Sequence, residues 1–238
     1  MYKTIGETEQ FLAEFIPLVS GVTHADIVIA PPFTAVAAAA KKAAGTSVAV
    51  AAQDLYWEKQ GAFTGEVSAA MLADAGCRYV IIGHSERRHI FGETDAAVFQ
   101  KTRAALGAGI TPIVCVGELA AEREAGHTEQ VLAAQFAGSV GGLTLQEFTA
   151  IIIAYEPVWA IGTGKVATPE IAAEAHRFIR SEASAKFGKD AASALRILYG
   201  GSVKPDNTRG LMAQPEIDGT LVGGASLDAK SFAAIVNF

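Results

Sequence analysis

Short apolar segments alternate with longer amphipathic segments along the whole chain of 238 residues. The apolar segments are continuous rather than alternating with polar residues, so we expect strands that are buried on both faces. A parallel sheet covered by helices provides that burial. The predicted strands are residues 26–30, 47–52, 79–83, 111–116, 150–155, 195–198 and 219–222, and the predicted helices are residues 7–19, 33–44, 95–107, 128–137, 169–186, 206–212 and 227–236.

The number of strands favours a barrel over an open sheet. Seven βα units exceed the usual five or six strands of an open sheet, whereas a closed α/β barrel takes eight. The chain opens on the helix at residues 7–19, with no strand in front of it. We therefore predict a (β/α)8-type barrel of which only seven of the eight strands are encoded. No linker or low-complexity segment divides the chain, so residues 1–238 are expected to form a single domain.

Composition argues against a membrane protein, a secreted protein and a general nucleic-acid-binding protein. The apolar segments are far shorter than the roughly 18 residues that a transmembrane helix needs. The first residues lack the basic and apolar stretches of a signal peptide. Cys77 and Cys115 lie in or beside apolar strands, so we expect reduced, structural thiols and a cytoplasmic protein. A net charge of −6 argues against broad nucleic-acid binding but not against a small anion, which backbone amides can hold.

Polar residues gather where the predicted strands end. The carboxyl ends of the strands of a βα barrel form one rim, and active sites are built there. We therefore expect one site that draws on all of these positions. The polar and glycine residues at or just after strand ends are Gln53, Asp54, His84, Ser85, Glu86, Glu118, Glu156, Gly200, Gly201, Ser202, Gly223 and Gly224.

The segment AYEPVWAIGTGK, residues 154–165, combines a carboxylate with a hinged loop. Glu156 follows the strand at residues 150–155, and glycines supply a flexible far side of the loop. A new helix is expected to start after Thr168 as N-cap, with Pro169 at its first position. A base on a rigid strand, followed by such a loop, is typical of an active site with a moving lid. The alternative is an ordinary βα connection with an incidental glutamate.

His84 lies in the segment GHSERR, where a strand ends and a short helix is predicted to begin. The positive end of that helix favours the neutral imidazole, which can donate a hydrogen bond to a carbonyl group. A capping or core histidine is the alternative for His84 considered alone. The other histidines are His24, His89, His127 and His176, and their spacing predicts no metal site.

Two glycine pairs follow the last two predicted strands. Gly200-Gly201 precedes Ser202, and Gly223-Gly224 follows the final strand. Paired glycines let the backbone approach an anion closely, and the loops after the last two strands of a barrel commonly bind phosphate. Either pair alone is weak evidence, because glycine also forms ordinary turns.

Taken together, these motifs resemble the triosephosphate isomerase family over essentially all 238 residues. The resemblance implies conversion of dihydroxyacetone phosphate to glyceraldehyde 3-phosphate through an enediolate, with no cofactor and no metal. Its substrate would be a small phosphorylated triose. The matching segments are AQD near Gln53, GAFTGE at residues 61–66, IIGHSERR at residues 81–88, CVGE at residues 115–118, AYEPVWAIGTGK, YGGSV and VGGASL.

The resemblance also implies roles for individual residues. Glu156 would be the base that moves the proton, and His84 the neutral electrophile, two roles that follow the family's well-known example of pKa tuning. The supporting residues would be Ser85, Glu86 and Cys115. The phosphate would be held near Gly162, Ser202, Gly223 and Gly224. The lid would comprise Pro157, Val158, Trp159, Ala160, Ile161, Gly162, Thr163, Gly164 and Lys165. Residues 61–66 resemble the loop of a homodimer interface, to which Gln53, Thr64 and Glu66 belong.

The start of the chain departs from the family pattern. In the family, the first strand leads into Asn-x-Lys-Met, and the lysine enters the active site; here Met1 takes the place of that Met. Lys3 is close in sequence but is expected in the turn before the first helix. Losing one such charged donor costs about 3 kcal/mol, or roughly 100-fold in rate. We therefore expect reduced or lost activity and a weakened dimer.

Three alternatives remain open from the sequence. A barrel that binds a phosphate ester without chemistry would keep the glycine pairs. A barrel that serves for oligomerisation would use an exposed strand edge. A start upstream of Met1 would restore the first strand.

Overall fold

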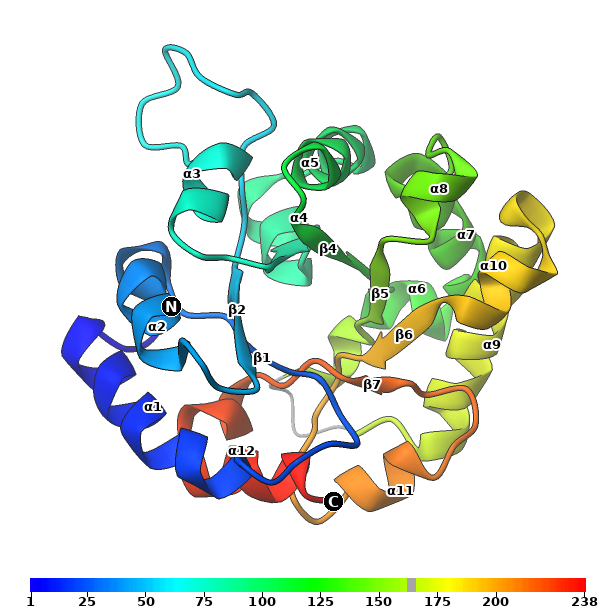
Figure 1. The fold of residues 1–238 in the computed structure, drawn as a ribbon. Coiled ribbons are helices and arrows are strands. Elements are labelled where there is room, and N and C mark those ends of the chain that lie inside the picture. Colours follow the sequence, from blue (N-terminus) through cyan, green and yellow to red (C-terminus); the bar gives the residue numbers. More distant parts are fainter. Residues whose placement is uncertain (162–165) are drawn as a thin grey trace.

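The computed structural model describes residues 1–161 and 166–238. Seven parallel strands form one sheet in sequence order, β1 to β7, and the sheet curls round on itself (Figure 1). All seven strands predicted from the sequence are confirmed, with ends shifted by two residues at most. The strands are β1 (Ile27–Ile29), β2 (Val48–Ala52), β3 (Tyr79–Ile82), β4 (Thr111–Val116), β5 (Ile152–Tyr155), β6 (Arg196–Tyr199) and β7 (Gly219–Thr220).

The middle of the sheet is buried on both faces, as continuous apolar strands require. Every residue of β5 is buried, and β4 is buried from its second residue onward. The register places Cys115 beside Ala154 and Val116 beside Tyr155, so β4 and β5 end at the same level. Polar residues that follow these two strands are therefore brought to one rim.

Among residues 1–161 and 166–238, the sheet does not close into a complete ring. In this part of the chain β1 pairs only with β2, and β7 pairs only with β6. Within the part of the chain that the structure describes, no ladder joins β7 to β1. The two shortest strands, β1 and β7, thus lie at the open edges of this curled sheet.

Helices surround the outside of the curled sheet (Figure 1). The sequence did not predict α3, α6, α8 and α10, because four to six residues are too few to display a helical period. The α-helices are α1 (Ile5–Val19), α2 (Val36–Ala43), α3 (Ala69–Asp74), α4 (Ser85–Phe91), α5 (Asp95–Gly107), α6 (Ala120–Glu124), α7 (Thr128–Ser139), α8 (Leu145–Phe148), α9 (Pro169–Phe187), α10 (Lys189–Ala194), α11 (Thr208–Met212) and α12 (Ala229–Val236), and the 3-10 turns are η1 (Phe33–Ala35), η2 (Val158–Ala160) and η3 (Gly224–Leu227).

The first helix, α1, packs between α2 and α12 (Figure 1). It begins at Ile5, earlier than predicted, because Thr4 and Glu7 form a capping box: Thr4 N donates to Glu7 Oε2 at 2.7 Å. Phe15 is fully buried, and its ring stacks on that of Phe232 in α12 at 4.9 Å. The apolar face of α1 is therefore covered by the last helix.

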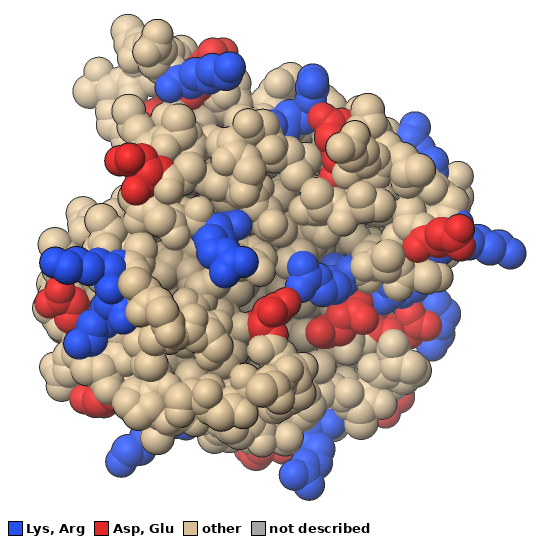
Figure 2. Space-filling model, viewed as in Figure 1, with Lys and Arg blue, Asp and Glu red and all other residues tan. Residues whose placement is uncertain are grey.

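Charged side chains of both signs adjoin one another on the face shown in Figure 2, rather than forming a patch of one sign. At the amino ends of the strands, Arg196 donates to Asp26 at 2.9 Å, and Arg180 donates to Asp218 at 2.8 Å. The first pair links the start of β6 to the residue before β1, and the second links α9 to the residue before β7. They lie at the end of the sheet opposite the polar rim.

Both cysteines, Cys77 and Cys115, are buried and free. Among the described helices, none has both the length and the apolar character needed to cross a membrane.

Candidate active site

Glu156 lies just past the end of β5, at the rim where the strands end. Its backbone N–H donates to Val116 O at 2.8 Å, so the pairing of β5 with β4 continues one residue beyond the assigned strand. The residue is 1% exposed. Gly117 makes this approach possible, because a Cβ on it would lie 1.7 Å from the carbonyl oxygen of Glu156. The carboxylate is thus delivered by the two best buried strands of the sheet.

The carboxylate of Glu156 accepts three hydrogen bonds from the residues that follow β3. His84 Nε2 lies 2.9 Å from Oε1. Ser85 donates its backbone N–H to Oε2 at 2.9 Å and its hydroxyl to Oε1 at 3.2 Å. These contacts bring together three residues that the sequence analysis placed on one rim. A buried carboxylate needs such donors, because leaving it unpaired would be costly.

His84 is the N-cap of α4, at the strand end where the sequence predicted that a short helix begins. Its Nδ1 accepts the backbone N–H of Glu86 at 3.3 Å, which requires a free lone pair on Nδ1. The proton of the neutral ring therefore sits on Nε2 and points to Glu156. This arrangement fixes the tautomer that can donate a hydrogen bond from Nε2.

The charge state of His84 is where the sequence prediction needs correction. The helix dipole alone was expected to favour the neutral ring. Burial acts in the same direction, but the hydrogen bond and the charge of Glu156 outweigh it, and the pKa of His84 is raised above its ordinary value. The sequence analysis considered the helix and not a carboxylate in direct contact. The contact with Glu156 therefore opposes the effect of the helix and of burial on the pKa of His84.

The side chains of Cys115 and Glu86 differ in how closely they approach Glu156 and His84. Cys115 is fully buried at the end of β4, and burial, with the nearby charge of Glu156, raises the pKa of its thiol well above the usual range. The side chain of Glu86 is 67% exposed, and its carboxylate lies 3.7 Å from His84 Nδ1. Glu86 thus contributes mainly through its backbone N–H.

The first half of the predicted lid is held by Glu118, which the sequence analysis placed on the rim without an individual role. The backbone N–H of Val158 donates to Glu118 O at 3.1 Å. The buried carboxylate oxygen Oε1 of Glu118 accepts from Trp159 Nε1 at 2.8 Å and from Tyr155 Oη at 3.1 Å. Val158 to Ala160 form the 3-10 turn η2.

The second half of the predicted lid falls in the gap of the description. Gly162, Thr163, Gly164 and Lys165 lie outside the described residues. Beyond the gap, the Thr168 side chain accepts the N–H of Ile171 at 3.3 Å, and Pro169 opens α9. The predicted N-cap and first helical position are confirmed.

The glycine pair after β6 is buried against the site. A Cβ on Gly200 would lie 2.9 Å from Glu156 Cγ, and one on Gly201 would lie 2.2 Å from Tyr199 Oη. This pair makes room for close packing, which is a different use of glycine from an approach to an anion.

The glycine pair after β7 has open surroundings. Gly223 and Gly224 are exposed, and Gly224 opens η3. Ser202, which follows the first pair, is partly buried. The exposed backbone of the second pair is therefore accessible to a ligand.

The loop between β2 and α3 projects from the body of the molecule (Figure 1). Thr64 and Glu66 are exposed on it. Gln53, at the base of the loop, donates from Nε2 to Ala30 O at 2.7 Å. The loop that resembles a dimer contact is therefore accessible in the single chain.

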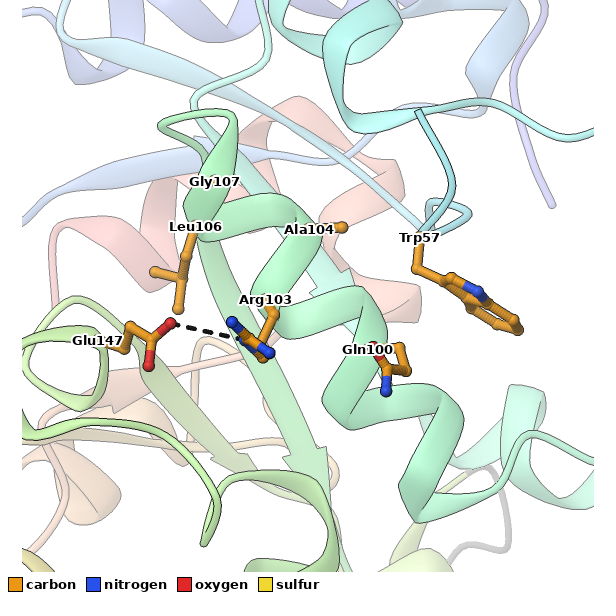
Figure 3. Close-up of a pocket in the computed structure, with 7 residues that line it drawn as sticks. All are labelled: Trp57, Gln100, Arg103, Ala104, Leu106, Gly107 and Glu147. Carbon is orange, nitrogen blue, oxygen red and sulfur yellow. Dashed lines mark ion pairs between the residues drawn. The ribbon is translucent and has the colours of Figure 1, made fainter. Parts of the chain in front are cut away.

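A recess of about 390 Å³ lies elsewhere, against the outer helices (Figure 3). Arg103 of α5 and Glu147 of α8 face one another there at 3.6 Å. None of the site residues predicted from the sequence lines it. Its lining residues are Trp57, Gln100, Arg103, Ala104, Leu106, Gly107 and Glu147.

The chemistry of the rim follows from the pair of Glu156 and His84. A carboxylate can remove a proton from carbon next to a carbonyl group, and an imidazole N–H can polarise that carbonyl. The two side chains together therefore provide acid–base chemistry. Separately, the described residues contain no cluster of three His, Cys, Asp or Glu side chains that could hold a metal ion.

Comparisons with known proteins agree over the whole chain. The family model described as triosephosphate isomerase matches residues 1–238. A triosephosphate isomerase of Solibacter usitatus (strain Ellin6076) is 63% identical over 100% of this chain and 96% of its own length. One from Trichlorobacter lovleyi is 56% identical over 100% of this chain and 95% of its own length. The crystal structure of triosephosphate isomerase from Bartonella henselae matches with a TM-score of 0.89 at 38% identity, covering 100% of this chain and 94% of that chain.

Proposed function

The chain belongs to the triosephosphate isomerase family, and from that premise we propose that it interconverts dihydroxyacetone phosphate and glyceraldehyde 3-phosphate. The reaction is a proton transfer between adjacent carbons through an enediolate. Its fold is the TIM barrel of that family, and residues 1–238 act as one domain. Isomerase chemistry of this kind uses neither cofactor nor metal.

The contact of 2.9 Å between Glu156 and His84 is the observation that carries the proposal. Glu156 is the base that takes the proton from one carbon and returns it to the next. His84 donates from Nε2 to the carbonyl oxygen and stabilises the charge that develops there. Ser85 and Cys115 support the base from the ends of β3 and β4, and Glu86 fixes the tautomer of His84 through its N–H.

The hydrogen bonds of Glu156 indicate that it changes partners during the reaction. In the ligand-free site its carboxylate is occupied by His84 and by both donors of Ser85. A substrate that bonds to His84 Nε2 displaces one of those contacts and frees an oxygen of Glu156 for the carbon-bound proton. Release of His84 from the carboxylate also removes the interaction that raises the pKa of the imidazole.

The substrate is held by its phosphate group. Gly223, Gly224 and Ser202 supply backbone N–H groups, joined by Gly162 of the lid. Exposure of Gly223 and Gly224 at the start of η3 supports this assignment. The lid, residues 157–165, closes over the substrate and excludes water.

A second copy of this chain is the proposed macromolecular partner. The projecting loop, in which Gly61, Thr64 and Glu66 are exposed, is suited to insert into that copy. Its base carries Gln53. Two free, buried thiols fit a reducing compartment such as the cytoplasm.

Lys3 takes no part in catalysis in this proposal. Its Nζ lies 5.1 Å from the ring centroid of Phe11 on α1 and not at a strand end.

The decisive experiment is an enzyme assay on the chain and on Glu156→Gln. The amide keeps the size of the side chain but cannot accept a proton. We expect turnover of dihydroxyacetone phosphate by the wild type and a loss of at least about 1000-fold in the variant. Glu174→Gln makes the same chemical change at an exposed position of α9 and serves as the control. Equal activity in all three chains would refute the assignment of the base.

A second function, binding of a phosphate ester without chemistry, is favoured by the exposed glycine pair after β7. Titration with 2-phosphoglycolate in low-salt buffer tests the anion site separately from catalysis. Binding without turnover would support this second function.

A further inference from the structure

Gly83 is the residue that joins β3 to His84, and both of its peptide groups are held by charged side chains. Its N–H donates to Glu93 Oε2 at 3.0 Å, and its carbonyl oxygen accepts from Arg88 Nε at 2.8 Å. Its φ is +70°, in the left-handed region that favours glycine. Because glycine resists rotation less than other residues, the direction of the following His84 depends on these two contacts.

Arg88 makes several hydrogen bonds at once beneath the polar rim. Besides Gly83 O, its guanidinium donates from Nη2 to Cys115 O at 3.1 Å, and from Nη1 to Asp95 Oδ1 at 2.5 Å. Nη2 also lies 3.1 Å from Ser139 Oγ, and that hydroxyl donates to Asp95. The side chain of Arg88 is 8% exposed. A single planar group therefore links the carbonyl of Gly83, just after β3, to that of Cys115, the last residue but one of β4.

Glu93, which binds the N–H of Gly83, is itself held by ion pairs, as Arg88 is. Its Oε1 is paired with Lys101, and it lies 3.5 Å from Arg87 Nε. Lys101 is also bonded to Asp54 at 2.7 Å. The side chain of Glu93 is 4% exposed. A carboxylate fixed in this way keeps the Gly83 N–H in one orientation.

We propose that Arg88, assisted by Glu93, is a positioning residue that aims the imidazole of His84 at the reacting carbonyl group. It does not touch the substrate and acts through the Gly83 peptide. The inference rests on the proposed function, in which His84 is the electrophile. Its physical basis is that a misplacement of about 1 Å in a catalytic group can cost roughly 100-fold in rate.

Arg180 provides a matched control, because it makes the same kinds of contact at the other end of the strands. Its Nη1 donates to Ala192 O at 2.7 Å and to Leu195 O at 2.8 Å, and its Nη2 donates to Asp218 at 2.8 Å. Its side chain is 20% exposed. Loss of either arginine therefore removes a guanidinium that bridges two carbonyls and an aspartate, but only Arg88 adjoins Gly83.

The experiment compares Arg88→Gln, Arg88→Lys and Arg180→Gln with the wild type. We expect Arg88→Gln to lower kcat about 100-fold with a smaller change in KM, and Arg88→Lys to recover part of that loss. Arg180→Gln should lower the melting temperature and leave kcat within about threefold, because the contacts of Arg180 lie at the amino ends of the strands and share no partner with Gly83. Equal kcat values for Arg88→Gln and Arg180→Gln would overturn the proposal.

A second readout does not need turnover. Histidine side-chain nitrogens, observed by 15N NMR on the full chain, report the tautomer and the titration of His84 directly. Arg88→Gln should shift the Nδ1 and Nε2 signals of His84 and change its titration midpoint, and Arg180→Gln should leave them unchanged. Unchanged His84 signals in Arg88→Gln would overturn the proposal even in an active enzyme.

The two tests separate the positioning role from the proposed function. A wild type without isomerase activity would defeat the proposed function, while the NMR comparison would still decide whether Arg88 orients His84. If Arg88→Gln does not fold, Asp95→Asn weakens the anchor of Arg88 without removing the guanidinium. Asp95→Asn should then shift the His84 signals in the same direction by a smaller amount, and no shift would count against the proposal.

Discussion

His84 Nε2 lies 2.9 Å from Glu156 Oε1, although the two residues follow strands that are not neighbours in the sheet. β4 lies between β3 and β5, so the contact reaches across the end of β4. Cys115 is the last residue but one of β4, and Gly117, just beyond β4, has no side chain to block the path. The short distance between Glu156 and His84 thus depends on the small residues at the end of β4.

Glu156→Asp is the first prediction. The shorter side chain moves the carboxylate back by about 1 Å, away from both His84 and the substrate, and we expect a loss of roughly 100-fold in kcat. KM should change much less, because the phosphate contacts do not involve Glu156. Steady-state kinetics measure both constants, and a raised KM with an unchanged kcat would contradict the role of Glu156 as base.

Gly117→Ala tests the close approach of β4 to Glu156. The added Cβ would lie 1.7 Å from the carbonyl oxygen of Glu156, so the two strand ends must separate. We expect the free energy of unfolding to fall by more than about 3 kcal/mol, the upper end for overpacking. For a chain of this size the melting temperature would drop by at least about 6 °C.

Gly107→Ala is the control for that prediction. Gly107 ends α5, and a Cβ there would meet no atom within 4 Å. Alanine in a helix is more stable than glycine by about 0.5–1 kcal/mol, so melting should occur at the same temperature or slightly higher. Differential scanning calorimetry measures the melting temperatures of both variants. A similar fall in melting temperature for Gly117→Ala and Gly107→Ala would mean that the contact with Glu156 is not what makes Gly117 necessary.

His176 makes the stability of the fold depend on pH. It is fully buried, its Nδ1 lies 3.0 Å from Glu216 O, and its ring meets that of Tyr155 edge to face. Burial lowers the pKa of His176 from 6.5 to about 4. Between these values the unfolded chain binds the proton and the folded chain does not. Stability is therefore full above about pH 6.5 and falls as the pH drops toward 4, by on the order of 3 kcal/mol.

His176→Asn isolates that contribution from the carboxylates that titrate over the same range. The asparagine amide can donate to Glu216 O as Nδ1 does, but it does not titrate. We expect the wild type and His176→Asn to differ in melting temperature by an amount that changes between pH 7 and pH 4, with the wild type losing more. Parallel melting curves across that range would show that His176 does not control the acid sensitivity.

Both thiols should resist alkylation in the folded protein. Burial raises the pKa of Cys77 to about 11, and that of Cys115 well above its usual value. The reactive thiolate is therefore scarce at neutral pH, and access is blocked as well. Mass spectrometry after iodoacetamide treatment should find no modified cysteine in the native chain and two after unfolding in urea. Rapid modification of the native chain at pH 7.5 would contradict the burial of these residues.

Much of the candidate site could be predicted from the sequence, because strand ends and loops have local sequence patterns. The continuous apolar segments predicted the seven parallel strands, and Glu156, His84 and Ser85 were placed on one rim by their positions after those strands. Thr168 and Pro169 predicted the start of α9 from capping alone. These features depend on neighbouring residues, and the sequence by itself determined them.

The tertiary structure decided everything that depends on contacts between distant segments. The carboxylate that raises the pKa of His84 comes from two strands away, so the helix alone predicted the wrong direction. Contacts between distant segments also explain two other residues. Gly200 allows close packing against Glu156, and Arg88 links the ends of β3 and β4. Such effects arise from charge and shape in three dimensions, and one-dimensional spacing does not record them.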